Sequence, residues 1–205
     1  MKYCIPLCFL FILLISGCKK HNSQPSFAFS DLQFKQGNTW TYSRYDATPN
    51  IRDTVTITIP AVYTKNDTTT YLWVQTLSGI SDTAFWFLHN DTLYGQAGNS
   101  TDAEPLFYEI VFPLSAGSNW YDGLSLGSDS LISQLKVNNT SYNNIYQVHW
   151  QDGIYTDFPT FENIYFVKGI GMIRYNQNTS LATYSISNLA STNYQWDLIS
   201  YHLNK

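Results

Sequence analysis

The sequence predicts a nearly all-β protein in which most neighbouring strands are antiparallel. Apolar and polar residues alternate with period two along much of the chain, as in residues 53–59, where Val55, Ile57 and Ile59 would share one face. After the first 17 residues, no segment keeps a 3.6-residue apolar period for ten residues. The connections between the predicted strands are short, which favours antiparallel pairing.

Each predicted strand is rich in Val, Ile, Thr or aromatic residues and is bounded by Gly, Asn, Asp, Ser or Pro. In chain order the predicted strands are residues 39–45, 53–59, 70–76, 83–88, 107–112, 131–137, 145–150, 163–168, 171–175, 182–186 and 196–203. Turns are expected at Asn90-Asp91, Asp122-Gly123 and Asp152-Gly153. Residues 30–36 are expected to form one short helical turn, capped by Ser30.

The chain begins with the features of a bacterial export signal. Lys2 precedes an apolar stretch over residues 5–15, which is shorter than the about 20 residues that a membrane-spanning helix needs. Residues 15–18 read Ile-Ser-Gly-Cys and resemble the lipobox of bacterial lipoproteins. This resemblance implies that residues 1–17 are a signal peptide and that lipid, including palmitate, is attached to Cys18.

The cysteine and histidine content restricts the chemistry that the mature chain can carry. Cys4 and Cys8 lie in the predicted signal peptide and Cys18 would be lipidated, so no free thiol remains for a disulfide, a nucleophile or a zinc site. The four histidines are dispersed, and the common nucleotide, phosphate and zinc-protease motifs are absent from the sequence. We therefore expect neither a metal nor a cofactor.

The residues after Cys18 predict a tether followed by a single domain. Residues 18–27 are polar, contain Pro25 and read as a short linker, which leaves residues 28–205 as one β-rich domain. The net charge of −4 and the 13% of charged residues exclude a nucleic-acid partner. The membrane, reached through the lipid, is the expected partner.

A short phrase occurs twice and suggests an internal repeat. Gly37-Asn-Thr-Trp40 is matched by Gly117-Ser-Asn-Trp120, and the two would begin similar units of about 80 residues, 34–111 and 112–205. In each phrase Gly permits a turn with positive φ and Trp covers the end of the sheet. Trp40 and Trp120 are therefore expected to be buried at equivalent positions, although chance similarity between β-strands is the alternative.

Three phrases in the second half resemble a group of Bacteroidota lipoproteins of unknown function. Residues 112–120 read F-P-L-S-A-G-S-N-W, residues 142–148 read Y-N-N-I-Y-Q-V, and residues 165–173 read Y-F-V-K-G-I-G-M-I. The resemblance implies a strongly curved sheet, as a half-barrel or a sandwich, and carries no catalytic residue. It also implies a location in the cell envelope, at the outer membrane. The periplasmic face is favoured, because surface-exported members often have acidic residues directly after the lipidated Cys, and here Lys19 and Lys20 follow it.

The densest polar cluster lies in residues 149–162. Its carboxylates Asp152, Asp157 and Glu162 stand beside aromatic residues, and a glycan hydrolase needs two carboxylates, one of them held protonated by apolar surroundings. A solvated hairpin loop explains the same residues without chemistry, because Asp-Gly and Phe-Pro are common in turns. Hydrolysis of a glycan is therefore kept as an alternative function.

The aromatic residues, 6 Trp, 16 Tyr and 12 Phe, are the stronger indication. Trp73, Trp86, Trp150 and Tyr155 lie where the strands or the loop have apolar residues to spare, so we expect them to contact a ligand rather than only the core. The sequence thus favours a non-enzymatic, lipid-anchored envelope protein that binds a glycan, a lipid or an envelope protein. A structural or assembly role, in which these rings serve the core or a partner protein, remains the other alternative.

Overall fold

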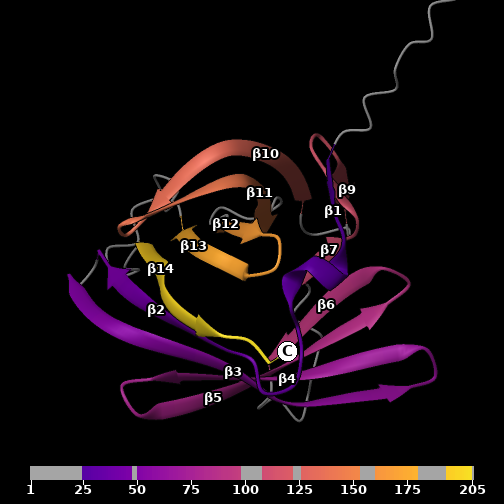
Figure 1. The fold of residues 1–205 in the computed structure, drawn as a ribbon, viewed down its shortest axis with the longest axis horizontal. Helices are drawn as coiled ribbons and strands as arrows, with labels where there is room; N and C mark the ends of the chain where they lie inside the picture. Colours follow the sequence, from indigo (N-terminus) through magenta and orange to yellow (C-terminus); the bar gives the residue numbers. More distant parts are fainter. Residues whose placement is uncertain are drawn as a thin grey trace, which may run out of the picture.

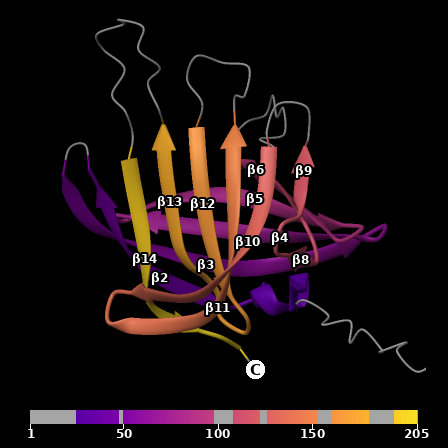
Figure 2. The same cartoon turned by 90° about the horizontal axis from the view of Figure 1, so that it is seen from above.

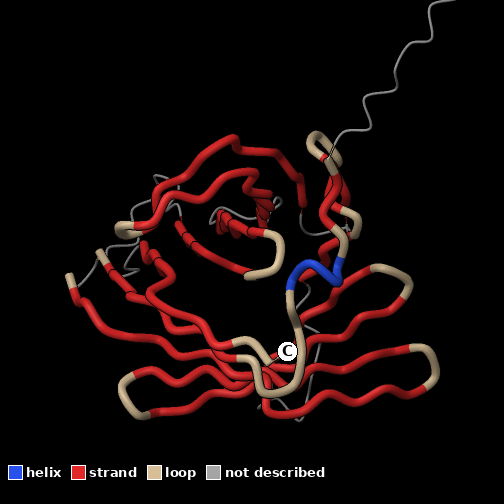
Figure 3. The backbone as a smooth tube through the Cα atoms, viewed as in Figure 1, coloured by secondary structure: helices blue, strands red, loops and turns tan. Residues whose placement is uncertain are grey.

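The computed structural model describes residues 25–47, 50–97, 108–121, 126–152, 160–179 and 193–204. Twelve strands form one antiparallel sheet in the order β7-β6-β5-β4-β3-β2-β14-β13-β12-β11-β10-β9, and this sheet is nearly closed into a barrel (Figures 1 and 3). The predicted nearly all-β class and the curved antiparallel sheet are therefore confirmed. Within the described residues, no helix is long and apolar enough to cross a membrane.

The first half of the sheet consists of β2 (Thr39–Asp46), β3 (Ile51–Lys65), β4 (Thr68–Leu77), β5 (Ile80–His89), β6 (Thr92–Ala97) and β7 (Tyr108–Val111). The second half consists of β9 (Asn119–Tyr121), β10 (Leu126–Val137), β11 (Thr140–Asp152), β12 (Thr160–Val167), β13 (Gly171–Thr179) and β14 (Asn193–His202). A separate two-stranded ladder pairs β1 (Ser26–Phe27) with β8 (Leu114–Ser115), and one 3-10 turn, η2 (Phe29–Leu32), follows β1.

Each half of the sheet is a meander in which every strand pairs with the next strand of the chain. The two meanders join where β2 pairs with β14, for example Tyr42 with Leu198 and Trp40 with Tyr201. Because the sheet curls at this junction, β11–β14 come to lie across β3–β5 (Figures 1 and 2). The inner faces of the two halves therefore face each other.

The alternation seen in the sequence decides which side chains form the core. Val55, Ile57 and Ile59 on β3 are fully buried, as the period-two pattern predicts. They belong to one apolar cluster with Trp40 and Tyr42. A second cluster contains residues of β1, η2, β6–β8, the bend between β7 and β8, β11 and β12: Phe27, Leu32, Leu93, Ile110, Phe112, Leu114, Tyr146, Val148, Ile164 and Phe166. The core thus lies inside the curve of the sheet.

Tight turns between the strands use residues that tolerate left-handed backbone conformations. Asn90 and Asp91 have φ of 48° and 61°, so the predicted turn between β5 and β6 is confirmed. Asn66 and Asp67 connect β3 to β4 in the same way, with φ of 49° and 61°. Positive φ at both central residues matches the twist of a two-residue hairpin. The two other predicted turns include residues outside the described ranges.

The described chain before β2 packs into the fold, including two residues assigned to the tether. Ser26 and Phe27, the last two residues of the predicted tether, form β1, and the Phe27 side chain is fully buried. The predicted helical turn is present as η2, but the expectation that Ser30 caps it is wrong. The turn begins after Ala28, whose backbone N–H donates to the Asp31 carboxylate at 2.9 Å.

The two Gly-x-x-Trp phrases form the same local hydrogen bonds. Gly37 N–H donates to the Ile59 carbonyl and Ile59 N–H donates to the Asn38 carbonyl. Gly117 N–H donates in the same way to the Asp129 carbonyl, and Asp129 N–H to the Ser118 carbonyl. Both glycines have positive φ, 84° and 94°, as the turn requires. A common origin of the two units stays a prediction.

The two tryptophans of these phrases differ in burial. Trp40 is 2% exposed, and its Nε1–H donates to the Ile170 carbonyl at 2.7 Å. Trp120 lies on the short end strand β9 and is only partly buried, across from Gly127 of β10. The expectation of equal burial is therefore wrong for Trp120. The reason is its place at the end of the sheet, where one side of the strand has no partner in the order of strands.

Candidate functional site

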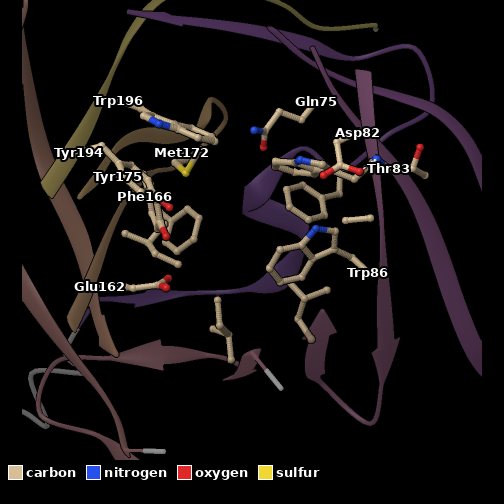
Figure 4. A pocket seen from close by; sticks show the side chains of 16 residues that line it. Gln75, Asp82, Thr83, Trp86, Glu162, Phe166, Met172, Tyr175, Tyr194 and Trp196 are labelled. Carbon is tan, nitrogen blue, oxygen red and sulfur yellow. Dashed lines mark hydrogen bonds between the residues drawn. The ribbon is translucent and has the colours of Figure 1, made fainter. Parts of the chain in front are cut away.

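A cavity of about 280 Å³ lies between the inner faces of the two halves of the sheet (Figure 4). One wall comes from β4–β7 and the loop after η2, and the other comes from β12–β14. The volume is at the lower end of the range for small-molecule sites, and most of the lining side chains are apolar or aromatic. The curvature of the sheet is thus sufficient to form a pocket that no single strand suggests.

The first wall is formed by Phe34, Trp73 and Trp86. The Trp73 ring lies 5.5 Å from Phe34 and 5.9 Å from Trp86, measured between ring centroids. Behind it, Trp73 stacks on the buried Trp40 at 6.4 Å. These contacts place Trp73 between Phe34, Trp86 and Trp40.

Gly95 explains how Trp86 reaches its position. Gly95 of β6 is paired with Trp86 of β5, and a Cβ atom at Gly95 would lie 3.2 Å from the indole ring. The missing side chain therefore leaves room for the indole to lie across the neighbouring strand. The same arrangement occurs on the end strand, where Trp120 lies over Gly127.

The second wall is formed by Tyr175, Tyr194 and Trp196, from β13 and β14. Their ring centroids lie 5.3 Å apart for Tyr175 and Trp196, 5.8 Å for Tyr175 and Tyr194, and 6.2 Å for Tyr194 and Trp196. Burial raises the pKa of Tyr194, and a hydrogen bond with Tyr175 partly opposes this increase. The Tyr194 hydroxyl therefore stays protonated at neutral pH and can donate a hydrogen bond.

Two carboxylates line the cavity from opposite halves of the sheet. Glu162 of β12 is 2% exposed, and Gln177 Nε2 donates to its Oε1 at 3.0 Å. Asp82 of β5 is exposed to solvent. Figure 4 shows the two side chains on opposite sides of the cavity. In the described part of the chain, the lining contains no Lys, Arg or His.

The residues predicted to bind a ligand fall in different places. Trp73 and Trp86 line the cavity. Trp150 is 2% exposed and is not a lining residue, although it is paired with Glu162 across β11 and β12. Tyr155 lies outside the described residues, as does the lipidation candidate Cys18.

Of the three carboxylates considered for hydrolysis, the structure describes the side chain of Glu162 alone. Glu162 lines the cavity, Asp157 lies outside the described residues, and Asp152 ends β11 with a side chain that is not described. The carboxylate that does share the cavity with Glu162 is Asp82, which sequence reasoning did not select. No group of three or more potential metal ligands occurs among the described residues.

The aromatic residues of the second wall were also missed. Tyr194 and Trp196 alternate on β14 with the polar residues Gln195 and Asp197, a pattern that indicates one common face but not what that face contacts. Tyr175 stands near the middle of β13, beyond the apolar start of that strand. These residues form a cavity wall because β2 pairs with β14, which joins strands from the two ends of the domain and brings the second half of the sheet opposite the first.

Comparisons with known proteins give two structural neighbours and no family. A "putative lipoprotein" from Parabacteroides distasonis has a TM-score of 0.47 and 11% identity, over 87% of this chain and 100% of the other. A "putative exported protein with YmcC-like fold" from Bacteroides fragilis has a TM-score of 0.46 and 10% identity, over 87% of this chain and 99% of the other. No protein-family model matches this chain, and no curated protein matches it.

Proposed function

We propose that this protein is a lipid-anchored protein of the bacterial cell envelope that binds a small ligand in the cavity of its curved sheet, without catalysing a reaction. The observation that carries the proposal is the pair of aromatic walls, Trp73 with Trp86 and Tyr175 with Trp196, on either side of one open space. Aromatic walls with a few polar groups are typical of binding sites. A core that needed these rings only for packing would leave no such space between them.

The place of the protein follows from the start of the sequence. The lipobox-like residues 15–18 support lipid attachment at Cys18. The absence of acidic residues directly after Cys18 supports the periplasmic face of the outer membrane. The ligand would accordingly be a component of the envelope, such as a glycan or a lipid.

Binding can be tested by titrating the mature lipoprotein with envelope glycans and lipids while its tryptophan fluorescence is measured. Trp73 and Trp196 stand on opposite walls, so we expect Trp73→Ala and Trp196→Ala each to weaken the affinity for a hit by about tenfold or more, because burying a large apolar side chain is worth roughly 1.5–3 kcal/mol. Tyr63→Ala is the matched control, since Tyr63 is 59% exposed and is not a lining residue.

The result of this experiment separates ligand binding from a structural or assembly role. Binding that only the wall variants weaken supports the proposal. If the protein binds none of the compounds, or if the wall variants bind as well as the wild type, a structural or assembly role of these rings is supported instead.

Glycan hydrolysis is a second candidate, and one observation favours it. Glu162 is buried and Asp82 is exposed, yet both line the same cavity, and a glycosidase needs two carboxylates in different environments. Product analysis of any glycan that binds decides this point. Turnover that is lost in both Glu162→Gln and Asp82→Asn would establish an enzyme, whereas binding without products supports the proposed function.

A further inference from the structure

We infer that the cavity selects a positively charged organic ligand, an amine or a quaternary ammonium attached to an apolar body, over an anion of the same shape. The inference rests on the proposed function, because it names the ligand class of the same cavity. It combines three observations: the carboxylates Asp82 and Glu162, the lack of basic side chains in the described lining, and the aromatic walls.

The charges around the cavity are of one sign. Asp82 and Glu162 contribute two carboxylates to the lining, from opposite halves of the sheet. Arg44 lies behind the second wall, 5.5 Å from the centroid of Tyr194, but it forms ion pairs with Asp46 at 3.2 Å and Asp53 at 3.5 Å. Its charge is therefore already balanced outside the cavity.

The sequence adds no basic side chain from the segments between the described ranges. Residues 98–107, 122–125, 153–159 and 180–192 contain four carboxylates, from Asp102, Glu104, Asp122 and Asp157, and no Lys, Arg or His. Whatever their positions, these segments cannot supply a cation to neutralise a bound anion.

The aromatic walls provide the second attraction for a cation. A cation within about 6 Å of an aromatic ring is attracted by the negative face of the ring, most strongly for Trp. Within each wall, neighbouring ring centroids are separated by 5.9 Å, for Trp73 and Trp86, and by 5.3 Å, for Tyr175 and Trp196. A cationic group that contacts one ring is therefore also near the next ring, while the apolar body fills the rest of the cavity.

An anion meets the opposite situation. Its charge would lie near the buried Glu162 carboxylate, and among the described lining residues no basic side chain could pair with it. Unpaired burial of a charge is strongly unfavourable. Fatty acids and anionic glycans are therefore disfavoured among the envelope compounds considered above. A neutral ligand gains the apolar contacts but not the charge attraction, so its affinity should lie between those of the cation and the anion.

Three probes of similar shape test the inference: 3-phenylpropylamine, 3-phenylpropan-1-ol and 4-phenylbutanoate, at pH 7. Each is titrated by calorimetry into the full mature lipoprotein in discs of uncharged galactolipid, with empty discs as the blank. We expect the amine to bind at least about tenfold more tightly than the alcohol, and the carboxylate to bind more weakly than the alcohol. The preference for the amine should decrease as the salt concentration rises.

Two variants and one control connect this preference to the cavity. Glu162→Gln retains the size of the side chain and an oxygen that can accept from Gln177, and Asp82→Asn changes an exposed residue. We expect each variant to lose most of the preference for the amine over the alcohol, about tenfold for Glu162→Gln. Asp67→Asn, in the β3–β4 turn, removes one negative charge away from the cavity and should change nothing.

The inference is overturned if the alcohol or the carboxylate binds as tightly as the amine, or if Asp67→Asn has the same effect as Glu162→Gln. It is also overturned if the amine does not bind at all. These outcomes leave the proposed function to be decided separately, because the screen with envelope glycans and lipids and the Trp73→Ala and Trp196→Ala variants do not depend on charge.

Discussion

Replacing Trp40 by Ala should destabilise the protein more than replacing Trp120, although both belong to the same repeated phrase. Trp40 is 2% exposed and packs on Phe34 and Trp73, with ring centroids 6.4 Å away in each case. Removing such a core Trp costs roughly 3–5 kcal/mol. The lost hydrogen bond from Trp40 Nε1 to the Ile170 carbonyl, at 2.7 Å, adds about 1 kcal/mol. The expected decrease in the free energy of unfolding is therefore about 4–6 kcal/mol.

Trp120→Ala is the matched comparison. Trp120 is partly buried, on an end strand of three residues, and its ring covers Gly127. Because part of the ring already contacts solvent, we expect a loss of only about 1–2 kcal/mol. Chemical denaturation followed by circular dichroism measures both values. Equal losses for the two variants, or a loss below about 2 kcal/mol for Trp40→Ala, would refute the argument from burial.

Two further predictions concern the anchor and the response to alkaline pH. Cys18→Ala should yield an uncleaved precursor or a chain that no longer partitions into detergent, because acyl chains contribute about 0.8 kcal/mol per buried CH₂; a processed variant that still partitions with membranes would contradict lipidation. Burial raises the pKa of Tyr42 well above its ordinary value of 10.0, and the Tyr142 charge raises it further. Tyr42 therefore loses its proton at a lower pH in the unfolded chain than in the folded protein. Its contribution to the free energy of unfolding is intact below about pH 10. Above pH 10 this contribution decreases by up to about 1.4 kcal/mol per pH unit, until the folded-state pKa is reached. When Tyr42→Phe is denatured at several pH values, its free energy of unfolding should decline less steeply above pH 10 than that of the wild type, by the slope that one proton contributes. A decline as steep as that of the wild type would contradict the assignment.

The strands could largely be predicted, because period-two alternation directly reflects a sheet with one buried face. The predicted strands 53–59 and 83–88 lie within β3 (Ile51–Lys65) and β5 (Ile80–His89), whose ends extend into polar residues. The whole of β6 (Thr92–Ala97) was missed because Gly95 interrupts its pattern. The Trp86 indole of β5 packs over Gly95, where a side chain of β6 would otherwise lie. Because this apolar contact comes from the neighbouring strand, the sequence of β6 itself shows no alternation. The predicted strand 182–186 lies outside the described residues.

The site could be predicted only in part, since its two walls are far apart in the chain. Trp73 and Trp86 were selected because β4 and β5 carry apolar residues on both faces, and both line the cavity. Trp150 met the same criterion but is buried and does not line the cavity, although its cross-strand partner Glu162 does. Tyr194 and Trp196 could not be assigned, because their partners across the cavity depend on how the whole sheet curls. Alternation shows which residues share a face, but not which faces meet.

The segment before β2, residues 26–38, contacts both halves of the sheet and contributes to the cavity. Phe34 lines the first wall, while Phe27 packs on Tyr146 and Phe166 of the second half, at 5.1 Å and 5.9 Å between ring centroids. Asp31 ties the same segment to the β12–β13 turn through Lys168, at 3.0 Å. A chain shortened to begin at β2 would therefore lose both a part of the cavity wall and a connection between the two meanders. Because this N-terminal segment of the fold is also part of the cavity wall, ligand binding has to be measured on a chain that keeps these residues.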